Sequence, residues 1–221
     1  SPFGFTQQNV IQDLLDEGFL GELRELVVLG ANHMFWDVSQ PLHWRQDKEI
    51  SGLNVLAMGI LHEAALRWTP PPTRVFAQMT TFEPTRPSES SDGTVAATVA
   101  DSVQVLTEIQ GGARGIYHLS GIDLFGPGLQ VHMYGSQGTI KLEVVPTERL
   151  LVGKADDKEL QVVDIPDEKR GGWRVEDEFI GAIRQQEIIR YTDFETGVRY
   201  MEFTEAVTRS AESNAPIDLS L

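Results

Sequence analysis

The chain has 221 residues, of which 41% are hydrophobic and 23% are charged, a composition typical of a globular protein rather than a disordered one. Its 33 acidic and 18 basic side chains give a formal net charge of -15, which argues against nucleic acid or an anionic membrane as a main partner, because phosphate binding needs clustered Lys and Arg. The absence of cysteine excludes a disulfide framework and a Cys-type metal site, and it fits a cytoplasmic protein.

The first 30 residues predict one helix followed by one strand. Thr6 is the candidate N-cap of the helix, in which four aliphatic residues between positions 10 and 15 recur at helical spacing. Gly18 is the expected C-terminal stop. The segment LRELVVLG, residues 23–30, is then expected to form a strand.

The next segment predicts a loop and a second helix. Residues 33–51 lack a clean hydrophobic period and contain a proline, which favours a long loop. A helix is expected from about Asn54 to Trp68, and the three prolines at 70–72 end it because proline cannot continue a helix.

From residue 73 onward the pattern changes to short strands joined by turns. Residues 83–93 are a polar, proline-bearing connection that we expect to be mobile, and the paired glycines at 111–112 indicate a hairpin. A run of short strands with tight turns predicts a mostly antiparallel sheet. The expected strands are TRVFAQMTTF, TVAATVADSVQVLTEIQ, ARGIYHLSGI, LQVHMYG, TIKLEVV, RLLVG and LQVVDI.

Two helices are expected to close the chain. In WRVEDEFIGAIRQQ, apolar residues at 175, 179, 182 and 183 share one face. In the second helix, Thr192 and Glu195 form a capping box, and Phe194, Val198 and Met201 supply, with Val207, much of the apolar stripe. The element order predicts an α+β fold: one domain over residues 1–221, with helices packed on one face of a large, mainly antiparallel sheet.

Sequence motifs for cofactors and metals are missing from the chain. The segment GGARG at 111–115 has the wrong spacing for a dinucleotide fingerprint and lies between expected strands. No strand-helix-strand unit is visible, so we expect this domain to bind no nicotinamide cofactor by itself. His62 is not followed by a second histidine four residues later, and the other histidines are scattered, so no metal site is expected.

Polar residues cluster near the second helix. Glu63 and Arg67 lie at positions i and i+4, and the simplest interpretation is a helix-surface salt bridge worth about 0.3–0.5 kcal/mol. Trp44 and Arg45 lie in the preceding loop. An aromatic ring beside a permanent cation suits recognition of a sugar or a carboxylate, and it suits surface packing nearly as well.

Five stretches, spread over nearly the whole chain, resemble the C-terminal domain of the glucose–fructose oxidoreductase / inositol dehydrogenase / MocA family. They are IQDLLDEGFLGELREL, HWRQDKEISGLNVLAMGILHEAALRW, VHMYGSQGTIKLE, VEDEFIGAIRQ and DFETGVRYMEFTEAVTRSAESNAPIDL. The resemblance implies a fold like the C-terminal domain of dihydrodipicolinate reductase, with an open sheet face that usually forms an oligomer interface. It further implies that an N-terminal Rossmann domain, absent from these 221 residues, binds NAD or NADP.

The resemblance also draws attention to a departure in the second helix. The family's helix typically reads Asp-x-Gly-x-His, with the Asp and His lining the substrate. If Gly59 is placed on the motif glycine, Ala57 and Leu61 occupy the Asp and His positions. His62 follows one residue later, rotated by about 100° on a helix. Either His62 substitutes, or the chain belongs to a branch with altered chemistry, or catalysis has been lost.

The leading hypothesis is therefore the substrate-binding and oligomerising half of an NAD(P)-dependent oxidoreductase that acts on a sugar, polyol or related secondary alcohol. The alternative is a non-catalytic binding or assembly module that retains the scaffold. His62 is the candidate for proton transfer, and the helix start is expected to border a concave surface onto which its ring opens. The candidates for substrate contact are Trp44, Arg45, Asp47, Asn54 and Met58. A homodimer or larger oligomer is expected through the open sheet face.

Overall fold

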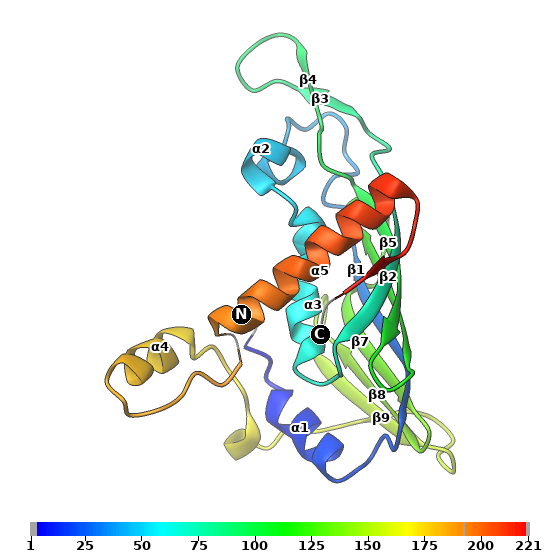
Figure 1. Ribbon diagram of the computed structural model, residues 1–221, viewed down its shortest axis with the longest axis vertical. Coiled ribbons are helices and arrows are strands. Elements are labelled where there is room, and N and C mark those ends of the chain that lie inside the picture. The colour runs from blue at the N-terminus through cyan, green and yellow to red at the C-terminus, as the bar shows by residue number, and fades with distance from the viewer. Residues whose placement is uncertain (1–3, 192, 220–221) are drawn as a thin grey trace.

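A computed structural model describes residues 4–191 and 193–219. It confirms the expected α+β fold, in which helices lie along one face of a large sheet (Figure 1). Its nine strands follow the order β10-β9-β8-β7-β1-β6-β5-β2-β11. Neighbouring strands are antiparallel except β1 and β6. The strands are β1 (Leu23–Ala31), β2 (Pro72–Thr80), β5 (Ser102–Ile109), β6 (Arg114–Ser120), β7 (Gly128–Gly135), β8 (Gly138–Glu143), β9 (Arg149–Lys154), β10 (Gln161–Val162) and β11 (Ile217–Asp218).

The helices occupy three places relative to this sheet (Figure 1). Helices α1 (Gln8–Asp16), α3 (Met58–Leu66) and α5 (Phe194–Ser213) lie along one side of it. Helix α2 (Lys48–Ser51) and the hairpin of β3 (Thr85–Pro87) and β4 (Thr94–Ala96) extend from one end, whereas α4 (Val175–Ile183) stands apart. Single 3-10 turns form at Trp44–Gln46, Val55–Ala57 and Asp167–Lys169. No helix in the described ranges is long and apolar enough to cross a membrane.

Strand alternation determines which side chains meet the helices. In β5, Val103, Val105 and Ile109 are buried on the helix side, whereas Leu106 between them is exposed on the other face. Side chains in a strand alternate between the two faces of the sheet. Leu106 lies opposite Ile116 of β6, which is also exposed. The open face of the sheet therefore carries an apolar pair near its middle.

The N-terminal helix differs from the expectation at its first turn. Its N-cap is Gln7 rather than Thr6, because the Thr6 hydroxyl and backbone N–H instead donate to the carboxylate of Glu148, at 3.1 and 3.0 Å. The expected stop is confirmed, since Gly18 has a φ of 72°. A residue with a side chain would be strained at this positive φ, whereas glycine is not.

The connection at 83–93 is not a free loop. Arg86 lies in β3 and is 1% exposed. Its guanidinium donates to the backbone carbonyls of Phe35 and Asp37, the latter at 2.8 Å. The sequence did not indicate this hairpin, because a polar sequence suits a hairpin held by a buried arginine as well as an open connection; the expected mobility of residues 83–93 stays a prediction.

The two closing helices form, but most of their apolar residues do not reach the core. Phe194, Val198 and Met201 are exposed, and of the four expected stripe residues only Val207 is buried. The α5 N-cap is Asp193, whose carboxylate accepts from the Thr196 N–H at 2.8 Å. The expected capping residue Thr192 lies outside the described residues. Helical spacing shows that residues share a face, but it does not show what the face meets.

Candidate functional site

Helix α3 is buried on nearly all sides because it lies between the sheet and α5, and its sequence is correspondingly apolar. Its first turn starts later than expected. Leu56 and Ala57 have φ values of 50° and 60°, a left-handed conformation that ends a right-handed helix. The helix therefore begins at Met58 instead of Asn54. The Asn54 side chain accepts a hydrogen bond from the Gly59 N–H at 3.0 Å and so caps the helix from outside.

Gly59 lies where α3 packs against α5, and the space there is too small for a larger residue. A side-chain carbon at this position would lie 3.0 Å from Tyr200 and 3.3 Å from Thr204, both on α5. Glycine thus permits close packing of α3 on α5. Met58 is fully buried in the core. The expectation that Met58 borders a concave surface was therefore wrong, because its side chain faces the domain interior.

His62 lies in the core of the molecule. Its Nδ1 is 2.8 Å from the hydroxyl oxygen of Tyr117 on β6, and its ring stacks on Phe203 of α5 with centroids 3.7 Å apart. His62 is 2% exposed, and burial lowers the pKa of its ring from 6.5 to about 3. The same burial raises the pKa of the Tyr117 hydroxyl above its usual range. His62 is thus held as a neutral ring at physiological pH.

This position corrects the expectation that the His62 ring opens onto the surface near the start of the helix. His62 belongs to the inner end of a cleft at the other end of α3 and is almost closed off from solvent. Leu61 falls at the family's His position if Gly59 is the motif glycine. Its side chain packs beside Gly30 of β1, and a Cβ atom added to Gly30 would lie 2.5 Å from Leu61 Cδ1. Leu61 is therefore a core residue.

The loop residues expected to contact substrate lie at the surface near α2. Trp44 is 48% exposed, and the guanidinium carbon of Arg45 lies 4.0 Å from the centroid of its ring, within the range of a cation–π contact. Asp47 caps α2 by accepting from the Glu49 N–H at 2.9 Å. The structure keeps Trp44 and Arg45 together but places neither against Met58 or His62.

Glu63 and Arg67 form a different kind of pair from the one expected. Their side chains are 1% and 4% exposed, and they meet through two contacts of 3.0 and 3.1 Å. Arg67 also donates to Gln8 of α1, and its guanidinium lies over the rings of Phe5 and Tyr191. The expectation of a surface salt bridge was wrong because the N-terminal segment and the chain before α5 cover this end of α3.

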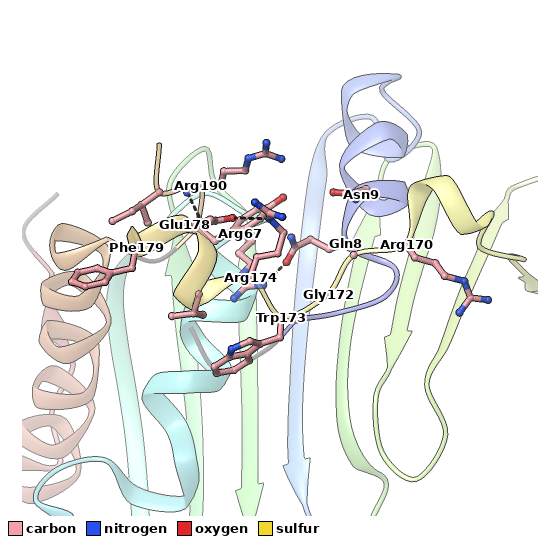
Figure 2. Close-up of a pocket in the computed structure, with 15 residues that line it drawn as sticks. Gln8, Asn9, Arg67, Arg170, Gly172, Trp173, Arg174, Glu178, Phe179 and Arg190 are labelled. Atoms are coloured by element: carbon pink, nitrogen blue, oxygen red, sulfur yellow. Dashed lines mark hydrogen bonds and ion pairs between the residues drawn. The ribbon is translucent and has the colours of Figure 1, made fainter. Parts of the chain in front are cut away.

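Two clefts meet at Arg67. The larger, of about 870 Å³, lies between the C-terminal half of α3 and the N-terminal half of α5. The smaller, of about 160 Å³, is shown in Figure 2 and lies between α1 and α4. Arg67, Arg190 and Tyr191 line both clefts and so form the wall between them.

Charged groups of both signs line the larger cleft. Glu195 and Arg199 pair at 2.7 Å on α5, and Glu202 lies on the same helix. Carboxylates accept hydrogen bonds and guanidinium groups donate them, so the cleft suits a small molecule with several hydroxyl groups. In the described ranges, no group of three His, Asp or Glu residues could hold a metal ion.

Sequence reasoning did not identify this cleft. Its polar residues come from α3, the chain before α5 and α5 itself, which are far apart in sequence. The i,i+4 spacing of Glu63 and Arg67 was the only available signal. That spacing cannot show that other segments cover the pair.

Comparisons with known proteins agree with this geometry. Residues 9–141, more than half of the chain, match the family model described as the GFO/IDH/MocA C-terminal domain. Solved structures with the same fold include levoglucosan dehydrogenase in complex with NADH (18% identity, TM-score 0.84) and in complex with NADH and levoglucosan (19%, 0.81). Another is an oxidoreductase domain protein from Kribbella flavida (16%, 0.86).

The matched region is almost all of this chain but only part of those proteins. It covers 97% of this chain in each case, and 64% of the two levoglucosan dehydrogenase chains and 65% of the Kribbella flavida chain. At these identities the likeness establishes the fold. No curated protein matches the chain.

Proposed function

The chain belongs to the GFO/IDH/MocA family, and we propose that it forms the substrate-binding and oligomerising half of an NAD(P)-dependent oxidoreductase acting on a sugar or polyol. The observation that carries the proposal is the match of nearly the whole fold to dehydrogenases whose structures contain NADH and a sugar. A separate N-terminal Rossmann domain of the complete protein supplies the cofactor site in this proposal.

We propose that this chain holds no dinucleotide site of its own, and the strand order of the described residues supports this. The parallel pair β1 and β6 is separated in sequence by β2 to β5, so it is not joined as a strand-helix-strand unit. When bound by the other domain, nicotinamide accepts or supplies the hydride. This chain binds and orients the secondary alcohol in the proposal.

Two places on the chain are candidates for the sugar. Trp44 and Arg45 present an exposed aromatic ring and a cation near α2, with Asp47 and Asn54 on the neighbouring turns. The larger cleft at the other end of α3 presents Glu202 beside other charged groups. The Trp44 ring packs against His43 and the Arg45 guanidinium but stays 48% exposed. We propose the Trp44 end, because an exposed aromatic ring suits stacking on a sugar.

The test is a steady-state assay of the complete gene product with NAD and NADP against a panel of sugars and polyols. Trp44→Ala is expected to raise KM for the best substrate, and Glu202→Ala is the matched variant for the cleft. If KM rises for Glu202→Ala and not for Trp44→Ala, the sugar site is in the cleft and not beside Trp44. Absence of activity with every substrate would reject the enzyme function.

One observation favours the second candidate function, a non-catalytic binding or assembly module. Ala57 and Leu61 replace the family's polar pair, Leu61 fills core space beside Gly30, and His62 is closed off. If the chain is a non-catalytic module, the complete gene product should bind a ligand or a partner without turning over any alcohol. The same assay, combined with calorimetric sugar binding, separates the two functions.

The open face of the sheet is our proposed oligomer interface. Leu106 and Ile116 lie opposite each other there, and they are 56% and 49% exposed. Adjacent exposed aliphatic residues in the middle of a sheet face gain free energy when a second copy covers them.

A further inference from the structure

One row of side chains crosses the open face of the sheet, the face turned away from the helices (Figure 1). It takes one residue from each of six neighbouring strands, β8, β7, β1, β6, β5 and β2. Strand register places these residues side by side, and both sequence neighbours of each one are buried. We call them the His132 row, and they are Lys141, His132, Val27, Ile116, Leu106 and Phe76. Four of the six are apolar, so the row gains free energy when it is covered.

His132 is held in this row as a neutral ring. The Gln130 amide nitrogen donates to the Pro127 carbonyl at 2.9 Å, and the oxygen of the same amide lies 2.8 Å from His132 Nε2. An amide oxygen only accepts, so Nε2 carries the proton and Nδ1 accepts from the Tyr134 hydroxyl at 3.3 Å. His132 is 8% exposed, and burial followed by the charge of Lys141 lowers the pKa of its ring. Both ring nitrogens are therefore occupied in the neutral form.

The charged groups around His132 favour the neutral form on balance. Lys141 stands directly opposite on β8, and like charges that face each other across strands are destabilising. Two carboxylates lie on the same surface. Glu143 on β8 raises the pKa of the ring less than Lys141 lowers it, and it pairs with Arg149, whereas Glu25 on β1 lies two residues from the position opposite His132. A protonated His132 would thus have a cation as its direct neighbour.

The charge of the open face is balanced, in contrast to the net charge of -15 of the whole chain. The row next to the His132 row alternates in charge, and its members are Glu25, Arg114, Glu108, Arg74 and Asp218. Among the described strands, Lys141, Glu143 and Arg149 bring the open face to four carboxylates and four cations. An isologous contact places the same patch on both copies. A balanced, partly apolar patch therefore suits a second copy of this chain, whereas an acidic patch would repel it.

We propose that a second copy of the chain covers the His132 row and that protonation of His132 releases it, which makes self-association sensitive to acid. The inference rests on the oligomer interface of the proposed function and adds the group that regulates it. Covering the row removes water from the ring and from Lys141, so a proton on His132 costs more in the dimer than in the free chain. Association is therefore strongest above the ordinary pKa of 6.5, and it weakens as pH falls through the pKa of the ring in the free chain, which lies below that value.

The test is the dissociation constant of the 221-residue chain, measured by sedimentation equilibrium at pH 7.5 and 5.0. It is expected to rise at least about ten-fold at the lower pH, because a symmetric dimer contains two copies of His132 and each contributes up to about ten-fold per pH unit. His132→Gln stays neutral and should remove the rise, and Lys141→Gln removes the like charge and should reduce it. His118→Gln is the matched control and should keep the wild-type rise, because this other histidine of the open face has the Asp123 carboxylate 3.4 Å away.

Acidification by itself predicts the opposite result. The negative net charge shrinks as pH approaches the pI of about 4.7, and weaker repulsion tightens association. An equal or lower dissociation constant at pH 5.0 rejects the switch and keeps the interface, and so does a rise that persists in His132→Gln. A monomer at both pH values rejects the interface together with the switch. Far-UV circular dichroism at each pH excludes unfolding as the cause of a rise, and the dehydrogenase assay judges the enzyme function separately.

Discussion

His62 Nδ1 lies 2.8 Å from the hydroxyl oxygen of Tyr117, and neither side chain is more than 2% exposed. A buried polar pair of this kind stabilises the fold only while both partners are present, since an unpaired buried polar group keeps its desolvation cost. The pair joins α3 to β6 across the interface between the helix layer and the sheet. Its position makes His62 a structural residue in this chain.

Removing both partners should therefore cost less than the two single removals added together. Tyr117→Phe is expected to lower the free energy of unfolding by about 1–3 kcal/mol, because Nδ1 of His62 loses its partner. The double variant with His62→Phe should lose less than the sum of the two single variants. Urea denaturation measures each value. Tyr134→Phe, at a more exposed Tyr–His contact of 3.3 Å, is the control and should change stability less.

The low pKa of His62 predicts a pH dependence of stability. The folded pKa of about 3 lies below the ordinary value of 6.5, so between these values the unfolded chain binds a proton that the folded chain does not. Stability is then complete above pH 6.5 and falls by up to about 1.4 kcal/mol per pH unit as pH drops toward 3. Urea midpoints at pH 7.5 and 5.5 should differ less in the His62→Phe/Tyr117→Phe variant. Equal pH slopes in both proteins would contradict this assignment.

Two ion pairs with the same i,i+4 spacing should behave differently. Glu63→Gln removes one charge of the buried pair with Arg67 and is expected to cost about 3–5 kcal/mol. Glu195→Gln breaks a pair in which both side chains are more than 60% exposed, and it should cost at most about 0.5 kcal/mol. Thermal and urea unfolding compare the two variants directly. Similar losses would show that burial does not control the strength of these pairs.

The open sheet face should control self-association. Light scattering of the 221-residue chain at micromolar concentration is expected to give at least twice the monomer mass of 24.6 kDa. Leu106→Lys combined with Ile116→Lys should yield a monomer, because like charges would be brought together at the interface. Val162→Lys, at an exposed site on the edge strand β10, should leave the mass unchanged. A wild-type monomer would remove the basis for this interface.

The 221-residue chain is expected to show no saturable binding of NADH or NADPH below millimolar concentration. The reason is the lack of a glycine fingerprint in its sequence and of a strand-helix-strand unit among its described elements. Isothermal titration calorimetry provides the measurement. A micromolar dissociation constant would show that this domain holds the cofactor itself.

The sequence by itself determined the fold class, most of the strands and the family. Alternation such as that of Val103 and Val105 is local and repeats along the chain, so it predicts strands without knowledge of their partners. The turn at Gly18 was equally readable, because a positive φ is a property of one residue. The resemblance to the GFO/IDH/MocA family came from motifs that are each continuous in sequence.

Only the tertiary structure decided what each face meets. The sequence could not show that β1 lies between β6 and β7, that His62 faces Tyr117, or that Phe179 of α4 is exposed in this chain. Burial, pKa and cleft shape depend on segments that are distant in sequence and brought together by folding. The spacing of Glu63 and Arg67 predicted a contact, but the covering of that contact by the N-terminal segment turned a surface pair into a buried one.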